Sequence, residues 1–168
     1  LAFRTPSLDR VDNLTDTDRD ALALMVLSAV FSGYDGARLD RALTQGENRV
    51  ADSASSSAMV TGRGPSLFML TGVPADGKTA AQVEEALRAQ VTRVAKEGVS
   101  EAELTRVKTQ WIASTVYERD SVMSQAQELG SNWVQGFPLD ANERLLTLLR
   151  TVTPAQVQAV AAKYFGDD

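Results

Sequence analysis

The feature of this sequence that most restricts its fold is a four-residue pattern, a Ser or Thr followed three positions later by Glu or Gln. It occurs at residues 79–82, 100–103 and 153–156. In such a capping box the two side chains hydrogen-bond to backbone N–H groups that the first turn of a helix leaves unpaired. Pro154 adds the residue favoured in a first helical turn. Three helices are therefore predicted to begin at these positions.

The helical pattern that begins at Ser100 continues to about Gly136. Three charged residues cluster at 118–120, and a break is expected there. Trp111 and Trp133 lie within this pattern. Because large aromatic side chains are usually buried, we interpret both as core residues rather than as ligand contacts.

An earlier helix is opened by Thr15 and Asp18 and closed by Gly33. It contains the most apolar run of the chain, ALALMVLSAVF at residues 21–31. A membrane-spanning helix needs about 18 to 20 apolar residues, so this run is too short to cross a bilayer. It predicts a buried core helix and no membrane span.

Three strands are predicted, at residues 1–5, 49–61 and 66–73, with a turn-rich connection at 62–65. The Ser- and Ala-rich segment 49–59 fits an edge strand or a mobile segment. The order is then a strand, two helices, a hairpin and four or five helices. This order indicates an α+β fold in which a small antiparallel sheet is covered on one face by several helices.

No linker or repeat divides the chain, so residues 1–168 are expected to form one domain. The sequence begins inside a predicted strand and stops at KYFGDD, residues 163–168. We expect it to be a fragment of a longer chain, truncated at both ends of its fold and left with an unpaired sheet edge.

The composition restricts the chemistry. The chain contains no histidine and no cysteine, the side chains that most often bind metals and transfer protons near neutral pH. The formal net charge is −5 and the basic residues are scattered, which argues against nucleic-acid binding. No catalytic residue, metal site or cofactor is therefore predicted in this domain.

Four segments in order carry a family resemblance: ARLDRAL at 37–43, EGVSEAELTRVK at 97–108, YERDS at 117–121 and TVTPAQVQAVAAKYF at 151–165. Together they resemble the pitrilysin or insulinase family of zinc metallopeptidases, which includes the mitochondrial processing peptidases. The resemblance implies an α+β domain. In that family such domains occur in catalytic and non-catalytic versions that face each other around a substrate chamber.

The family's catalytic domain binds zinc through an inverted H-x-x-E-H motif, which a chain without histidine cannot form. The resemblance therefore implies a non-catalytic, C-terminal-type half, inactive alone, whose zinc belongs to a partner half in cis or in trans. It would close the chamber and bind extended peptide by adding a strand to a sheet edge. A structural assembly subunit without proteolytic function is the alternative. Family analogy also implies a bacterial, periplasmic protein, with a cytoplasmic location as the alternative.

Some non-catalytic halves contribute an arginine and, seven residues later, a tyrosine that contact the substrate. Aligned on ARLDRAL, these positions fall at Thr44 and Ala51, and neither matches. A gap within residues 46–49 would shift the alignment.

Arg38, Arg41 and Arg49 are the remaining candidates for contact with a peptide carboxylate or carbonyl. A solvated or ion-paired role is the more common one for such residues. Ser55, Ser56 and Ser57 form no nucleophile pattern, and we interpret them as a polar strand face.

Overall fold

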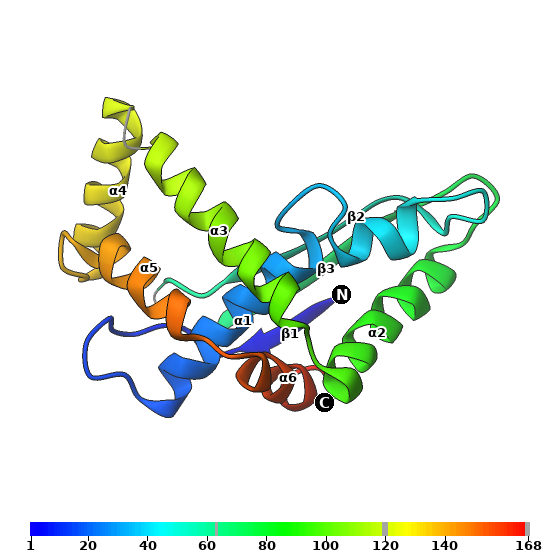
Figure 1. The fold of residues 1–168 in the computed structure, drawn as a ribbon, viewed down its shortest axis with the longest axis horizontal. Helices are drawn as coiled ribbons and strands as arrows, with labels where there is room; N and C mark the ends of the chain where they lie inside the picture. The colour runs from blue at the N-terminus through cyan, green and yellow to red at the C-terminus, as the bar shows by residue number, and fades with distance from the viewer. Residues whose placement is uncertain (63, 119–120, 167–168) are drawn as a thin grey trace.

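A computed structural model of the chain describes residues 1–62, 64–118 and 121–166. Its elements follow the predicted order, with five helices after the hairpin (Figure 1). They are β1 (Ala2–Thr5), α1 (Asp16–Ser32), the short π-helix η1 (Asp40–Thr44), β2 (Ala51–Met59), β3 (Ser66–Pro74), α2 (Ala80–Glu97), α3 (Glu101–Glu118), α4 (Val122–Gln135), α5 (Ala141–Thr151) and α6 (Pro154–Lys163). The predicted α+β class is confirmed.

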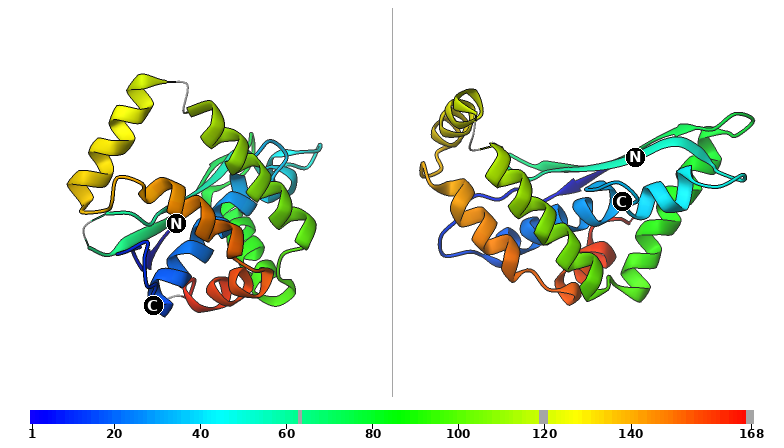
Figure 2. Two further views of the ribbon diagram at one scale, coloured as in Figure 1. Left: turned by 60° about the vertical axis from the view of Figure 1, so that its left-hand side comes forward. Right: turned by 45° about the horizontal axis from the view of Figure 1, so that its top comes forward.

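β3 is the central strand of an antiparallel sheet with the order β1-β3-β2. The right-hand view of Figure 2 shows the sheet on one side of the molecule and the helices on the other. On the inner face, Phe68 of β3 meets Phe31 of α1 edge to face, with ring centroids 6.4 Å apart. On the outer face, the cross-strand neighbours Met59 and Leu67 are exposed. The helices therefore cover one face, as predicted.

The predicted second strand, 49–61, is too long at both ends. Val50 donates its backbone N–H to Leu43 of η1 at 2.9 Å, so β2 begins at Ala51. At the other end the carbonyl of Val60 accepts the N–H of Leu8 at 2.6 Å, which ties it to the N-terminal loop. Long-range contacts of this kind leave no local signal in a strand's sequence.

The predicted helix starts are confirmed. Complete capping boxes are formed by Thr15 with Asp18, Thr79 with Gln82, Ser100 with Glu103, and Thr153 with Gln156. Gly33 ends α1, as expected. The break between α3 and α4 also falls where the charges cluster, although residues 119 and 120 of the YERDS segment lie outside the described residues.

The prediction that both tryptophans are core residues is wrong for one of them. Trp111 packs half-buried against the core, but the side chain of Trp133 on α4 is 76% exposed. The reason is the orientation of α4, which turns polar residues such as the buried Asn132 toward the domain. A helical apolar pattern fixes which residues share a face but not whether that face meets the rest of the domain.

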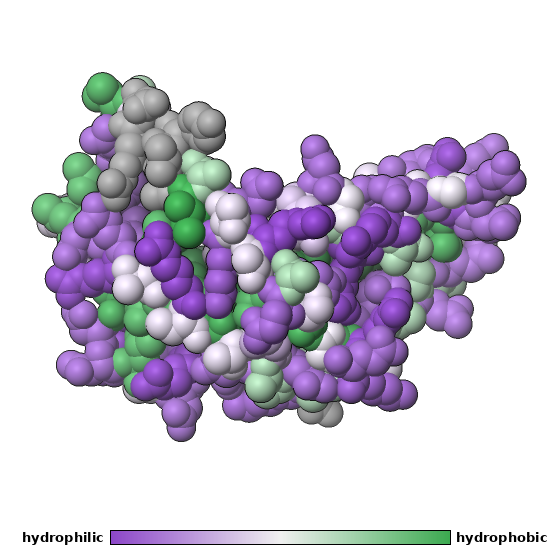
Figure 3. All heavy atoms as spheres, viewed as in Figure 1, coloured by the Kyte–Doolittle hydropathy of each residue, from purple (hydrophilic) through white to green (hydrophobic). Residues whose placement is uncertain are grey.

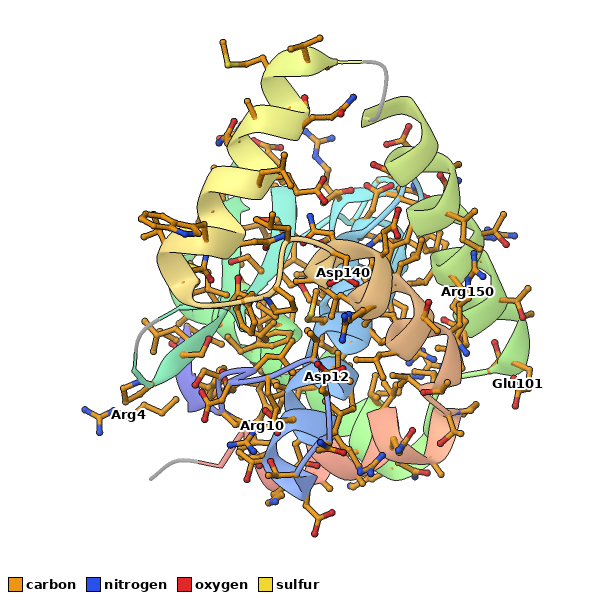
Figure 4. All side chains as sticks on the ribbon, turned by 90° about the vertical axis from the view of Figure 1, so that its left-hand side faces the viewer. Arg4, Arg10, Asp12, Glu101, Asp140 and Arg150 are labelled. Atoms are coloured by element: carbon orange, nitrogen blue, oxygen red, sulfur yellow. The ribbon has the colours of Figure 1, made fainter. Side chains whose placement is uncertain are left out.

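An ion cluster ties the N-terminal loop to the start of α5. Figure 4 shows Asp12 and Asp140 on these two neighbouring segments. The guanidinium of Arg144 donates to both oxygens of Asp12 at 2.7 and 2.8 Å and to Asp140 at 2.8 Å.

Among the helices of the described residues, none is long and apolar enough to cross a membrane.

Candidate functional site

A polar cleft of about 420 Å³ lies between η1, α2 and α3. Five charged residues and Gln90 line it, together with Ala42; the charged residues are Arg38, Arg41, Arg93, Glu97 and Glu103. The hydropathy view shows predominantly hydrophilic surface between α2 and α3 (Figure 3). The fold therefore brings two of the three candidate arginines, Arg38 and Arg41, into one cleft.

Arg38 is anchored at the base of this cleft. Its guanidinium donates to both carboxylate oxygens of Glu103, at 2.7 and 2.8 Å, and to the carbonyl of Gly98 at 3.2 Å. The two side chains are only 15% and 18% exposed. Because its Nε and Nη2 donors are already used within the domain and its charge is paired with Glu103, Arg38 holds η1 against the start of α3 rather than presenting a free cation.

Glu103 takes part both in the ion pair with Arg38 and in the capping box of α3. It accepts hydrogen bonds from the N–H and the hydroxyl of Ser100 at 3.0 and 2.9 Å. The hydrogen bond from Arg38 is the main cause that lowers the pKa of Glu103 to about 2, against the opposing effect of burial. The carboxylate is therefore ionised throughout the physiological range. The ion pair joins residues 65 positions apart, so no local sequence pattern indicates it.

Arg41 and Arg49 differ from Arg38. The nearest carboxylate oxygen to Arg41 is Oε1 of Glu103 at 3.9 Å, which Arg38 already contacts at 2.7 Å. Arg49 lies outside the cleft and pairs with Asp52 at 3.0 Å. Their side chains are 51% and 49% exposed. Arg41 is thus the candidate arginine with the weakest internal pairing.

The two aligned positions for the family's arginine and tyrosine do not form a site. The hydroxyl of Thr44 hydrogen-bonds to the carbonyl and the carboxylate of Asp40, one turn back. That bond lowers the pKa of Asp40. Ala51 is completely buried in the core. A tyrosine at this position would overpack the core, so the pair cannot be restored by simple substitution.

The free edge of β2 is partly occupied by α1. The backbone N–H of Ser56 donates to Oγ of Ser32 at 2.9 Å, and that hydroxyl contacts the Ser56 carbonyl at 3.2 Å. Across the sheet, Leu70 exchanges its backbone hydrogen bonds with Leu1 rather than with its β2 neighbour. In an antiparallel ladder such groups alternate, so those of Ala54 and Ala58 also point to the free edge.

A groove follows this edge. Ser28, Ser32, Ser56 and Trp111 line one cavity of about 250 Å³. It shares Met25 and Ala58 with a second cavity of about 410 Å³, which continues under the polar face of α4. Ser56 shares this face of β2 with Ala54 and Ala58, whereas Ser55 and Ser57 lie exposed on the opposite face, so two of the three serines form the expected polar strand face.

α4 presents the largest run of exposed apolar side chains. Val122, Leu129 and Trp133 recur at helical spacing on one face, and Met123 flanks them. Figure 3 shows hydrophobic surface over this helix. We call Val122, Met123, Leu129, Trp133 and Val134 the α4 patch; all are exposed. The amphipathic spacing was visible in the sequence, but its outward orientation was not.

In the part of the chain that the structure describes, no group of three or more His, Cys, Asp or Glu side chains is placed to hold a metal ion. The residues present also do not fit the zinc motif of a pitrilysin-type catalytic domain, since that motif needs two histidines and the sequence has none.

Comparisons with known structures support the fold over almost the whole chain. A protease from Helicobacter pylori is similar with a TM-score of 0.84 and 20% identity, covering 99% of this chain and 38% of that protein. A peptidase M16 inactive domain from Pseudomonas fluorescens has a TM-score of 0.72 and 18% identity, covering 98% and 36%. The periplasmic protease PqqL from Escherichia coli has a TM-score of 0.70 and 19% identity, covering 98% and 17%.

The chain thus spans little more than a third of the Helicobacter pylori protease. Among curated protein sequences, none matches it. The family model of the peptidase M16 inactive domain matches residues 1–111, about two thirds of the sequence. This match includes two of the four sequence segments, 37–43 and 97–108, and confirms the family resemblance. The chain belongs to the peptidase M16, or pitrilysin, family as an inactive domain.

Proposed function

We propose that this domain is the non-catalytic half of a zinc peptidase, which packs against a zinc-bearing half, closes the substrate chamber and helps to bind peptide. The observation that carries the proposal is the match to an inactive peptidase domain in a chain that has no histidine. The hydrolytic zinc and its activated water then belong to the partner, and this half contributes binding.

The α4 patch supports a protein partner. Contiguous exposed apolar surface on a soluble domain commonly marks an interaction site. Trp133 is the largest side chain of this patch, and exposed tryptophans often dominate the binding energy of an interface. In α4, Glu128 is the one charged residue, and it lies on the inward, polar side lining the neighbouring cavities. The patch therefore suits an apolar protein surface better than a charged one.

The β2 edge supports peptide binding. An extended peptide can pair with outward backbone groups of Ala54, Ser56 and Ala58, and its side chains would enter the groove beside them. The hydroxyl of Ser32 now occupies the backbone groups of Ser56. An incoming strand would displace it and regain equivalent hydrogen bonds.

Periplasmic residence is part of the proposal. Its support is that PqqL, one of the structurally similar proteins, is a periplasmic protease. A structural assembly role without proteolysis is the second candidate, which the α4 patch supports equally well because docking alone would use it.

The test combines the chain with the H-x-x-E-H half encoded in the same polypeptide or operon. Light scattering detects a complex, and a fluorogenic peptide reports cleavage. We expect a one-to-one complex that cleaves the peptide while each half alone does not. A complex whose zinc-bearing half is equally active alone would favour the assembly role. Failure to form any complex would overturn both roles.

Replacing Ser32 with alanine tests the β2 edge. We expect this change to raise the affinity for a fluorescein-labelled peptide substrate roughly three- to tenfold, because an incoming strand no longer competes with a hydrogen bond of about 1 kcal/mol. Fluorescence anisotropy measures the affinity. Ser28→Ala is the matched control, since the hydroxyl of Ser28 hydrogen-bonds to the side chain of Ser56 rather than to the backbone groups that an incoming strand would use. Unchanged or weaker binding by Ser32→Ala would exclude this edge.

A further inference from the structure

The cleft between η1, α2 and α3 carries a charge that the fold does not neutralise. Arg38 and Glu103 form a bidentate pair at its base, and Arg93 pairs with Glu97 at 2.8 Å at its rim. The positive and negative charges within each of these two pairs cancel. Among the described residues that line the cleft, the remaining charge is that of Arg41.

Glu103 cannot neutralise Arg41 fully, because it already accepts hydrogen bonds from Arg38 and Ser100. Its closest approach to Arg41 is 3.9 Å, longer than a hydrogen bond. One carboxylate is thus shared by two guanidinium groups, which leaves a single net positive charge beside the cavity.

The position of Arg41 is well defined at its backbone. Its N–H donates to the carbonyl of Ala37 at 3.0 Å, on a segment that Arg38 fastens to α3. A guanidinium offers a planar set of donors that matches the two oxygens of a carboxylate. Gln90, on α2, adds a carboxamide that can donate to the same ligand.

The charge of the cleft selects among anions. A phosphate dianion would meet the carboxylates of Glu97 and Glu103 in a site with one net positive charge. A carboxylate monoanion balances that charge. A purely apolar ligand gains little, because Ala42 is the one apolar side chain among the described residues of this lining.

We propose that Arg41, assisted by Gln90, forms a binding site for a single carboxylate group of a peptide, either an acidic side chain or a free C-terminus. The carboxylate specificity comes from the cleft itself, whereas its assignment to a peptide rests on the proposed function. Arg38 and Glu103 act as positioning residues that hold η1 in place.

The test titrates the isotope-labelled chain with three short probes and follows the spectrum by NMR. The probes are acetyl-Ala-Glu-Ala-amide, acetyl-Ala-Gln-Ala-amide and acetyl-Ala-Gln-Ala with a free C-terminus. We expect the first, the third or both to bind, and the second to bind at least fivefold more weakly. Which of the two acidic probes binds identifies the source of the carboxylate. Equal behaviour of all three, or tighter binding of inorganic phosphate, would overturn the proposal.

Two matched variants locate the site. Arg41→Gln is expected to weaken the acidic probe about five- to tenfold, the range for loss of a charge-assisted contact at a half-exposed site. Arg49→Gln removes an arginine of nearly equal exposure outside the cleft and is expected to change nothing. Equal effects of the two variants would show that only overall charge matters. Because no partner is present, these results do not depend on pairing with the zinc-bearing half.

Discussion

Replacement of Trp133 by serine is expected to weaken binding to the zinc-bearing half by about 30-fold or more, which corresponds to the loss of about 2 kcal/mol or more that defines an interface hot spot. The side chain is 76% exposed in the isolated domain, so its removal should change the free energy of unfolding by less than about 0.5 kcal/mol. Calorimetric titration of the two halves measures the binding, and thermal melting measures the stability.

Gln127→Ala is the control for this experiment. Gln127 lies on the same helix but lines the cavity on its polar side. We expect its replacement to leave the affinity within twofold of the original. If both variants bind the zinc-bearing half normally, the α4 patch is not the interface and the halves meet elsewhere.

The second large effect concerns Glu103. Glu103→Gln keeps a residue that can complete the capping box with Ser100 but removes the negative charge opposite Arg38. Because this pair is more than four fifths buried, leaving Arg38 without its counter-charge should cost about 2 to 3 kcal/mol of folding free energy. For a chain of this length that lowers the melting temperature by about 4 to 12 °C.

Glu84→Gln is the matched control, because Glu84 pairs with Arg88 at 3.0 Å on the surface of α2. An exposed pair four residues apart contributes only about 0.3 to 0.5 kcal/mol. Similar melting temperatures for the two variants would show that the buried pair contributes no more than a surface one.

The same carboxylate predicts a pH dependence. The pKa of Glu103 is lowered from 4.5 to about 2 in the folded chain, so the unfolded state takes up the proton first as the pH falls. Its stabilising contribution is complete above about pH 4.5 and is lost as the pH falls toward 2. The loss of stability across this window should be smaller in Glu103→Gln, as measured by denaturant unfolding at several pH values.

The parts of the fold that the sequence predicts are those with a local cause. A capping box needs only four residues, so the starts of α1, α2, α3 and α6 were predicted correctly. The family resemblance was also readable, because its segments combine such caps with the spacing of apolar residues. The family match confirms it.

The features that could not be predicted depend on contacts between distant residues. Arg38 was a candidate for contact with a substrate, yet its partner Glu103 lies 65 residues away and fixes it in a structural pair. Trp133 was expected in the core because large aromatic side chains are usually buried, but the sequence of α4 does not determine which face of the helix packs against the domain. Both outcomes are decided by tertiary packing.

The hydroxyl of Ser32 also protects the molecule against its own copies. An exposed strand edge is a template for aggregation, since any unpaired strand can extend the sheet. In this domain the backbone N–H and carbonyl of Ser56, in the middle of β2, are already hydrogen-bonded to Ser32 of α1. At Ser56 a second copy would gain no net hydrogen bond, which weakens its pairing along the edge, whereas a peptide held nearby by other contacts would meet the same edge at high local concentration. A single serine thus makes the edge favour a peptide that other contacts already hold nearby over a second copy of the chain in free solution.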